Sequence, residues 1–286
     1  MQNKRVTVIT VCYNVERDIE RTMLSVLNQS YQNIEYIIID GASKDRTVDI
    51  AKHISSQYPK RDISVFCEPD KGIYDAMNKG ISKATGDWLN FMNAGDTFAS
   101  NSIVSEMVSE ISDGISILRG NIIRNYNGVH VKSCGVVTQN PGLMDMFNNT
   151  FHHQACFIQR SLFSEYGLYS TAYKLCSDWK FFFDCVVLHH VKTKYVDKTV
   201  ALFEMDGASS KNVTRYIDER ESYLKSVLGE EVFECLKELD LYRKSTFATA
   251  CYKLRSRLLS SLSPEMFNRL LTAKRMVRAF FHLKVN

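Results

Sequence analysis

Proline, glycine and paired cysteines are scarce in this sequence, and each shortage excludes a class of protein. Only 4 prolines and 13 glycines occur in 286 residues, which argues against long disordered segments. The 8 cysteines show no C-x-x-C spacing, so neither a zinc site nor a disulfide scaffold is expected. We predict reduced thiols in a cytoplasmic protein. No uncharged apolar run approaches the roughly 20 residues that span a bilayer, and the N-terminus lacks a signal-peptide pattern.

The usual phosphate-binding loops are absent as well. The first predicted strand is not followed by G-x-G-x-x-G, and G-x-x-x-x-G-K-[ST] occurs nowhere in the chain. A phosphate-bearing ligand would therefore need another positive partner, and a divalent cation held by carboxylate can supply it.

Charge is unevenly distributed along the chain. The segment from Arg243 to the end has ten Lys or Arg and one acidic residue, so it carries +9, whereas the first 242 residues carry −5. An acidic body without a binding motif disfavours nucleic acid as a partner. The basic end interleaves its charges with apolar residues, namely Leu270, Leu271, Met276, Val277, Phe280, Phe281 and Leu283. Such helices either lie on a membrane surface or pack on the protein with solvated charges, and both interpretations stay open.

Strand and helix patterns alternate through the first 96 residues. Buried-strand patterns at 6–14, 34–40, 63–70 and 87–96 are separated by helical patterns at 15–31, 41–58 and 72–86. Alternation of this kind predicts an α/β fold with a mostly parallel sheet flanked by helices. Ligands of such sheets bind beyond the carboxyl ends of the strands. The polar residues at those ends are Tyr13, Asn14, Asp40, Glu68, Asp70, Asn93 and Asp96.

The stretch "WLNFMNAGDTF" (88–98) ends a hydrophobic run on one carboxylate, Asp96. Aspartate is common in turns, so a plain strand-end turn is one interpretation. A metal or ligand site is the other, and three strand-end loops with carboxylates at one edge favour it.

The second half offers fewer signals. Alternating strands at 116–125 and 130–137 flank Asn127-Gly128, a hairpin turn. His152 and His153 are adjacent and would point to opposite faces of a strand, so they are not a ready metal pair. Asp178 precedes an amphipathic helical pattern, where an N-cap role would explain it structurally.

Four segments resemble the inverting family 2 glycosyltransferases with the GT-A fold, in particular the bacterial group that builds surface polysaccharide. They are "TVCYN", "SVLNQSYQNIEYIIIDGASKDRT", "CEPDKGIYDAMNKGISKATGDWLNFMNAGD" and "CSDWKFF". The likeness is dense over 6–98 and weaker to about 210. It implies a Rossmann-like GT-A domain over 1–212, with a nucleotide-sugar half at 1–98 and an acceptor half at 99–212. Residues 213–286 would form a helical, basic extension.

The resemblance assigns roles to individual residues. Donor-binding positions fall on Thr10, Tyr13, Asn14, Asp40, Asp70, Lys71 and Asn93. The metal-binding carboxylate falls on Asp96, although most members have D-x-D where this chain has Asn93-Ala94-Gly95-Asp96. Asp178 matches the catalytic base. His153, Trp179 and Gly207 fall on segments near the acceptor or diphosphate, and for His153 a structural role is an open alternative.

The implied function is transfer of a sugar from a nucleotide-sugar, with UDP favoured, to a saccharide or lipid-linked saccharide, aided by Mn²⁺ or Mg²⁺. O-antigen, capsule or exopolysaccharide synthesis is the implied setting, in the cytoplasm or at the inner face of the plasma membrane. Two alternatives are a nucleotidyltransferase and a non-catalytic scaffold of a polysaccharide assembly. The first would normally show a glycine-rich loop after the first strand, and "VCYNVERD" has no glycine.

Overall fold

A computed structural model describes residues 4–126, 128–204 and 212–245. The chain divides into two compact units, Met1–Leu224 and Lys225–Asn286. The sequence places the start of the helical extension at residue 213, whereas the unit boundary falls inside the helix α9 (Val213–Leu228). The part of α9 up to Leu224 therefore belongs with the first unit.

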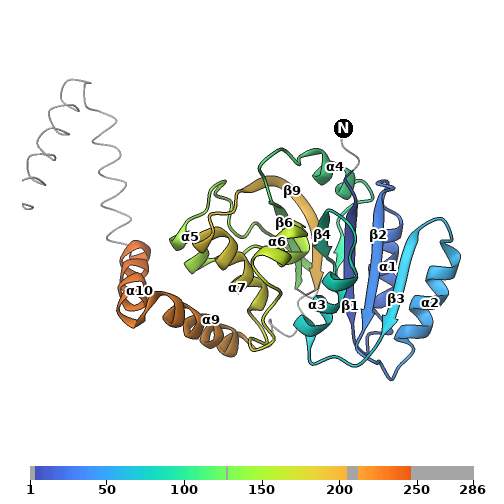
Figure 1. Ribbon diagram of the computed structural model, residues 1–286, viewed down its shortest axis with the longest axis horizontal. Helices are drawn as coiled ribbons and strands as arrows, with labels where there is room; N and C mark the ends of the chain where they lie inside the picture. Colours follow the sequence, from blue (N-terminus) through green and yellow to red (C-terminus); the bar gives the residue numbers. More distant parts are fainter. Residues whose placement is uncertain (1–3, 127, 205–211, 246–286) are drawn as a thin grey trace, which may run out of the picture. The chain divides into compact units, whose positions relative to one another are not determined.

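The first half of that unit alternates strands and helices as the sequence predicts (Figure 1). Its elements are β1 (Val6–Cys12), α1 (Ile19–Leu27), β2 (Ile34–Asp40), α2 (Thr47–Gln57), β3 (Asp62–Cys67), α3 (Ile73–Lys83) and β4 (Trp88–Phe91). The strands lie in the order β3-β2-β1-β4, and all three pairings are parallel. This confirms the predicted parallel sheet, with the carboxyl ends of its strands at one edge.

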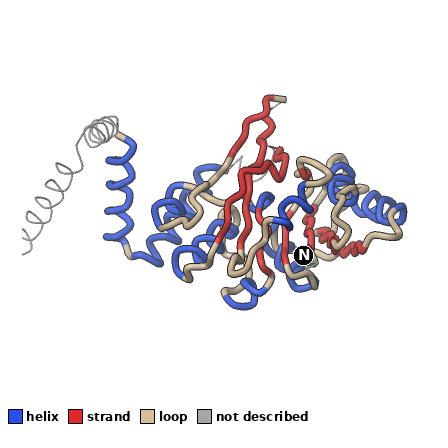
Figure 2. Tube along the Cα trace, turned by 90° about the horizontal axis from the view of Figure 1, so that it is seen from above, coloured by secondary structure: helices blue, strands red, loops and turns tan. Residues whose placement is uncertain are grey.

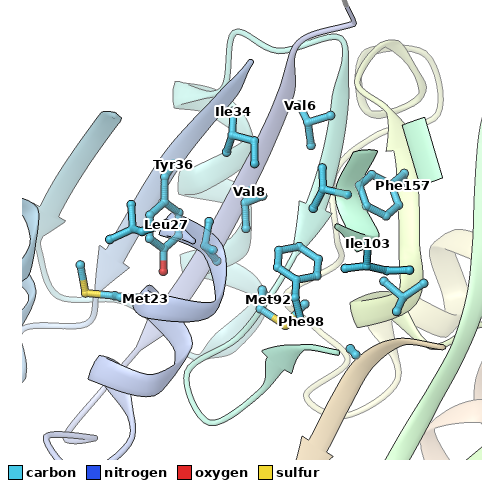
Figure 3. Packing of buried hydrophobic residues seen from close by; sticks show 14 of the residues in the cluster. Val6, Val8, Met23, Leu27, Ile34, Tyr36, Met92, Phe98, Ile103 and Phe157 are labelled. Atoms are coloured by element: carbon cyan, nitrogen blue, oxygen red, sulfur yellow. The ribbon is translucent and has the colours of Figure 1, made fainter. Parts of the chain in front are cut away.

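Helices cover both faces of these strands, as Figure 2 shows. On one face, Met23 and Leu27 of α1 pack toward Val8 and Tyr36 (Figure 3). On the other face, α3 contacts β1 and β2. Both central strands are therefore buried along their whole length, which is why they read as continuous apolar runs.

The second half adds the remaining elements of the first unit and most of the antiparallel pairings. They are β5 (Thr97–Phe98), α4 (Ile103–Ser109), β6 (Ile117–Tyr126), β7 (Val129–Ser133), α5 (Leu143–Asn148), a 3₁₀ turn (His153–Ala155), β8 (Cys156–Gln159), α6 (Ser161–Glu165), α7 (Ser177–Phe183), a π-helical turn (Asp184–Leu188) and β9 (Thr193–Glu204). The sheet continues as β4-β8-β6-β9-β5, and β7 pairs with β6 as the predicted hairpin. In the second unit, α10 spans Glu230–Lys244.

The loop after β4 is held at both of its ends. Met92 and Phe98 are buried in the core on either side of it (Figure 3). Thr97 and Phe98 also pair antiparallel with Leu202 and Ala201 of β9. The segment 93–96 is consequently a short loop that is fixed at both ends, rather than a long surface loop.

One predicted core position is wrong. The spacing of Ile73, Met77 and Ile81 within the helical pattern at 72–86 predicts that all three share one buried face of the helix, and Met77 and Ile81 are indeed buried. Ile73 is 41 % exposed because it is the first residue of the helix, beyond the edge of the sheet.

Candidate functional site

A cleft of about 560 Å³ lies at the carboxyl ends of β1 and β4. The segments after β4, the start of α3, the 3₁₀ turn at His153 and the first turn of α7 all contribute to it. Its polar and charged lining residues are Asp18, Arg21, Tyr74, Asn93, Asp96, His153, Gln154, Lys174 and Asp178. The structure thus brings together four predicted site residues that come from three separate segments of the sequence: Asn93, Asp96, His153 and Asp178.

The Asn93–Asp96 segment is a tight turn that presents one carboxylate. The amide of Asp96 donates to the carbonyl of Asn93 at 3.0 Å, and Gly95 takes a left-handed φ of +104° that favours glycine. The Thr22 hydroxyl donates to the Asp96 carbonyl at 2.8 Å and accepts from the Gly95 amide at 3.0 Å. The turn is therefore fastened to α1, and its side chains have a fixed position.

Asp96 itself is 5 % exposed and lines the cleft. Gln154 Nε2 donates to its Oδ2 at 3.1 Å. Asn93 Oδ1 is buried and has no hydrogen-bond partner among the described residues. Asp96 and Asn93 thus line the same cleft, and hard divalent cations take carboxylate and amide oxygens as ligands.

These oxygens alone do not make a complete metal cage. Within the described ranges, no group of three or more His, Cys, Asp or Glu residues gathers with the spacing of a metal site. The donor set fits a cation that takes most of its ligands from a bound diphosphate and from water, as Mg²⁺ commonly does.

Asp178 accepts hydrogen bonds on both carboxylate oxygens. The Tyr74 hydroxyl donates to Oδ1 at 2.8 Å, and His153 Nδ1 donates to Oδ2 at 3.0 Å. Asn93 Nδ2 lies 3.2 Å from His153 Nε2. An amide donor there requires Nε2 to accept, which leaves the ring proton on Nδ1, facing Asp178. The chain Asn93–His153–Asp178 therefore links the turn after β4 to α7.

Burial alone would raise the pKa of Asp178. The hydrogen bond from His153, followed by that from Tyr74, outweighs burial and lowers this pKa below its usual value. Asp178 is consequently ionised at neutral pH, with lone pairs left to accept a further proton donor.

A second cavity of about 330 Å³ adjoins the larger cleft at Asp178 and His153. It shares five lining residues with the larger cleft: His153, Gln154, Leu175, Asp178 and Phe203. Its remaining lining comes from Ile122, Arg124, Thr150, Phe151, His152, Val213 and Tyr216. Asp178 lines both cavities.

Helix α9 holds the segment that carries Asp178. Arg220 donates to the carbonyls of Met146 and Phe147, and its guanidinium lies 4.2 Å from the ring centre of Trp179. Trp179 is fully buried, and its indole N–H donates to the Met146 carbonyl at 2.9 Å. Trp179 therefore lies behind Asp178 rather than in either cavity.

The predicted donor-binding residues Tyr13, Asn14, Asp70 and Lys71 lie outside the larger cleft, at the ends of β1 and β3. A Cβ on Gly41 would come within 2.4 Å of Asp70 Oδ2 and 3.3 Å of Tyr13 Cδ2, so both side chains lie close against this glycine. The ring of Tyr13 is 58 % exposed beside them. An aromatic face next to a carboxylate suits a nucleoside, which stacks and donates hydrogen bonds.

Two predicted donor contacts are already used by the protein. Thr10 is fully buried, and its hydroxyl contacts the Tyr36 hydroxyl and the Met92 carbonyl. Asp40 is 1 % exposed and accepts from the amide and hydroxyl of Ser43 and from Cys67. Both side chains therefore make structural hydrogen bonds at the ends of their strands. Gly207 lies outside the described residues.

The structure also corrects the structural explanation for Asp178. The sequence suggests an N-cap, but α7 begins at Ser177 with Cys176 at the cap position, and Asp178 lies in the first turn. Its side chain accepts hydrogen bonds from Tyr74 and His153, which both lie outside α7. Capping therefore does not account for this buried carboxylate.

Sequence reasoning missed three functional candidates. Tyr74 lies inside the quoted "GIYDAMNKGI" stretch, so its position there is a signal that could have indicated it. Lys174 and Arg124 give no such signal, because a lone cation in a loop or a strand is usually solvated. Only the fold brings them to the two cavities.

His152 makes stability depend on pH. Burial, followed by the nearby charge of Arg124, lowers the pKa of His152 from 6.5 to about 3. The folded state thus prefers neutral His152, so its contribution is complete above pH 6.5 and is lost as pH falls toward 3. We expect the free energy of unfolding to fall by up to about 2–3 kcal/mol between pH 6.5 and pH 4.5 through this residue. Urea titrations at several pH values should show that the free energy of unfolding depends less on pH in His152→Gln than in the wild type.

The exposed His130 supplies the control. His130→Gln should keep the wild-type slope. Equal slopes in wild type and His152→Gln would contradict the assignment.

Comparison with known proteins places these features in a family. Residues 7–166 match the sequence profile described as Glycosyl transferase family 2. The chain is 28 % identical over 213 residues to a PGL/p-HBAD biosynthesis glycosyltransferase of Mycobacterium bovis, a match that covers 72 % of this chain and 79 % of the relative. It is 32 % identical over 183 residues to an uncharacterized glycosyltransferase of Mycobacterium tuberculosis, covering 62 % of this chain and 66 % of that protein.

Solved structures share the fold at low identity. A mannosyltransferase from Pyrobaculum calidifontis in complex with GDP-Man and Mn²⁺ matches with a TM-score of 0.66 and 15 % identity, over 96 % of this chain and 80 % of that one. Residues 1–349 of S. aureus TarS in complex with UDP-GlcNAc match with a TM-score of 0.61 and 15 % identity, over 91 % and 77 %. These likenesses confirm the expected GT-A fold.

Proposed function

The chain belongs to glycosyl transferase family 2, and we propose that it moves a sugar from a nucleotide-sugar donor to a hydroxyl of a saccharide, with inversion at the anomeric carbon. One observation carries this proposal: an ionised, buried Asp178 that lines two adjoining cavities. The larger cleft would take the donor and the smaller one the acceptor. Synthesis of bacterial O-antigen, capsule or exopolysaccharide is the setting we propose, with a lipid-linked saccharide as acceptor.

The reaction is a single displacement. The acceptor oxygen bonds to the anomeric carbon while the bond from that carbon to the diphosphate oxygen breaks, and the hydroxyl proton passes to Asp178. Tyr74 and His153 hold the carboxylate in place from both oxygens. They also keep it deprotonated before the step, which general-base catalysis requires. Because attack and departure occur on opposite faces, the configuration inverts.

A divalent cation, Mn²⁺ or Mg²⁺, is proposed to bind at Asp96, with Asn93 Oδ1 as a second oxygen ligand. When bound, it would neutralise the charge that develops on the leaving diphosphate. The proposal is supported by the Mn²⁺ in the mannosyltransferase complex. Arg21 and Lys174 line the same cleft and add positive charge near the diphosphate.

The donor would bind with its base near Tyr13, Asn14 and Asp70, and with Lys71 at the rim. We favour UDP as the nucleotide, and UDP-GlcNAc in the TarS complex is consistent with it. A thermal-shift panel of UDP-, GDP- and dTDP-sugars with Mn²⁺ tests the proposal. A nucleotide-sugar that raises the unfolding temperature in a Mn²⁺-dependent manner is expected. No stabilisation by any of the three classes would contradict donor binding.

Tyr74 is expected to set the acidic limit of activity. Removing its hydroxyl in Tyr74→Phe takes away a hydrogen bond to the ionised Asp178, so the pKa of Asp178 rises. A hydrogen bond to a charged group contributes roughly 1.5–3 kcal/mol, which corresponds to about one to two pH units. The acidic limb of the kcat–pH profile should move upward by that amount.

Tyr58→Phe is the matched control, because the Tyr58 hydroxyl contacts Asn28, away from both cavities. Its pH profile should equal that of the wild type. An unshifted limb in Tyr74→Phe would separate Tyr74 from the ionisation of Asp178.

The C-terminal basic segment is proposed to bind the cytoplasmic face of the plasma membrane. None of the helices that the structure describes combines the length and hydrophobicity needed to cross a bilayer. Most of the predicted basic helix, 246–286, lies outside the described residues. Each Lys or Arg near an anionic leaflet contributes about 1 kcal/mol of attraction, which salt screens.

We expect the full chain to float with anionic vesicles at low salt. A variant with four substitutions, Arg255→Gln, Arg257→Gln, Lys274→Gln and Arg275→Gln, should float much less. Equal flotation of the two proteins would instead favour helices that pack on the protein.

A further inference from the structure

Arg124 is a positive side chain in the smaller cavity that the proposed reaction does not use. It lies on β6 between Val131 of β7 and Phe203 of β9, and it lines the cavity that also reaches Asp178. Its Nε is buried, yet it has no hydrogen-bond partner among the described residues. Buried donors are normally paired, and a charged one is costly to leave unpaired.

Arg119, on the same strand, is an example of a structural arginine whose guanidinium nitrogens are all hydrogen-bonded. Arg119 is 2 % exposed, and its guanidinium donates to the Val136 and Thr138 carbonyls and to Thr193 Oγ1. Its charge also lies 4.5 Å from the ring centre of Phe151. Arg119 thus has a built set of partners, whereas Arg124 presents its charge to a cavity.

No described residue of the cavity forms an ion pair with Arg124. Asp178 is the one acidic residue among the described residues that line it, and both of its oxygens already accept from Tyr74 and His153. His152 is held neutral, partly by the charge of Arg124 itself. The other lining groups are neutral side chains, including Thr150, Phe151 and Tyr216. Arg124 therefore lines this cavity, near the proposed base, without an ion-pair partner among the described residues.

We propose that the acceptor is an acidic saccharide, whose oxyanion binds Arg124 while its reacting hydroxyl faces Asp178. The inference rests on the proposed function and adds the chemical class of the acceptor. A guanidinium recognises carboxylate and phosphate alike through its fork of N–H donors. The oxyanion can therefore come from the carboxylate of a sugar acid or from a phosphate ester on the saccharide, and the experiment separates these two sources.

The test is a titration of the full chain by calorimetry. UDP, GDP and dTDP are first titrated with Mn²⁺, and the nucleotide that binds is then kept saturating so that the larger cleft is occupied. Three probes follow: methyl glucuronide, glucose 1-phosphate and the neutral methyl glucoside. We expect at least one anionic probe to bind at least about 10-fold more tightly than the neutral glucoside. Preference for the glucuronide indicates a sugar acid, and preference for glucose 1-phosphate indicates a phosphate ester.

Substitutions assign the effect to this residue. Arg124→Met should lose the preference for the anionic probe, and Arg124→Lys should keep part of it because the charge remains. Lys192→Met removes an exposed cation that lines neither cavity and should bind as the wild type does. Nucleotide binding by each variant shows that it is folded.

Three results would overturn the inference: no binding of either anionic probe, equal binding of the neutral glucoside, or an unchanged preference in Arg124→Met. The nucleotide titration keeps these failures distinct from failure of the proposed function. If no nucleoside diphosphate binds, the function itself is wrong. If one binds and the anionic probes do not, only the acidic acceptor is excluded.

Discussion

Asp178→Asn is expected to lower kcat by roughly 10²–10⁴-fold, the usual contribution of general-base catalysis. The substitution keeps the size of the side chain but removes its ability to take a proton. The fold should tolerate it, because the new amide can keep its oxygen toward His153 Nδ1 and turn its nitrogen toward the Tyr74 hydroxyl, which can accept as well as donate. Donor affinity should stay close to that of the wild type, since the loss concerns the transfer step.

Asp184→Asn is the matched control. Asp184 follows α7 directly, contacts Lys180 and Tyr223, and lines neither cavity. Its kcat should stay near the wild-type value. The anomeric configuration of the product, read by NMR, should be inverted relative to the donor. Either an active Asp178→Asn enzyme or a retained configuration would remove Asp178 from its role as base.

Asp96→Asn and chelation by EDTA are each expected to reduce transfer by about 10³-fold. Compensation of the diphosphate charge by a cation contributes several kcal/mol to the transition state, and each 1.4 kcal/mol is a factor of ten. The variant keeps the oxygen that accepts from Gln154 but loses the negative charge. Added Mn²⁺ should restore the EDTA-treated wild type and should not restore the variant.

Asp87→Asn controls for the loss of a carboxylate next to the same strand, β4. Asp87 directly precedes β4, at its opposite end, and accepts from the Arg5 amide, far from the cleft. Its activity and its Mn²⁺ dependence should match the wild type. Full turnover of Asp96→Asn, together with insensitivity to EDTA, would show that the transfer needs no cation at Asp96.

The sequence was sufficient for the first half of the fold. The buried strands 6–12 and 34–40 read as unbroken apolar runs because helices cover both of their faces. The polar residues that follow those strands marked the edge where the cleft lies, since parallel strands place their carboxyl ends together. The motifs around Asp96 and Asp178 pointed to the two carboxylates through their likeness to a family. Each of these signals lies within a short stretch of sequence, so it can be recognised without knowing the tertiary structure.

Tertiary structure decided what those residues contact. Tyr74 and His153 meet Asp178 across separations of 104 and 25 residues, and no period in the sequence encodes such pairs. Thr10 and Asp40 look like ligand-facing residues in sequence, but Tyr36, Met92 and Ser43 already satisfy them. Residues of β6, β9 and α9 line the second cavity. The position of Arg124 in that cavity can therefore be seen only in the folded structure. Residue types and the ends of strands can be recognised from short stretches of sequence. Hydrogen-bond partners and cavities cannot, because they depend on distant segments that only the fold brings together.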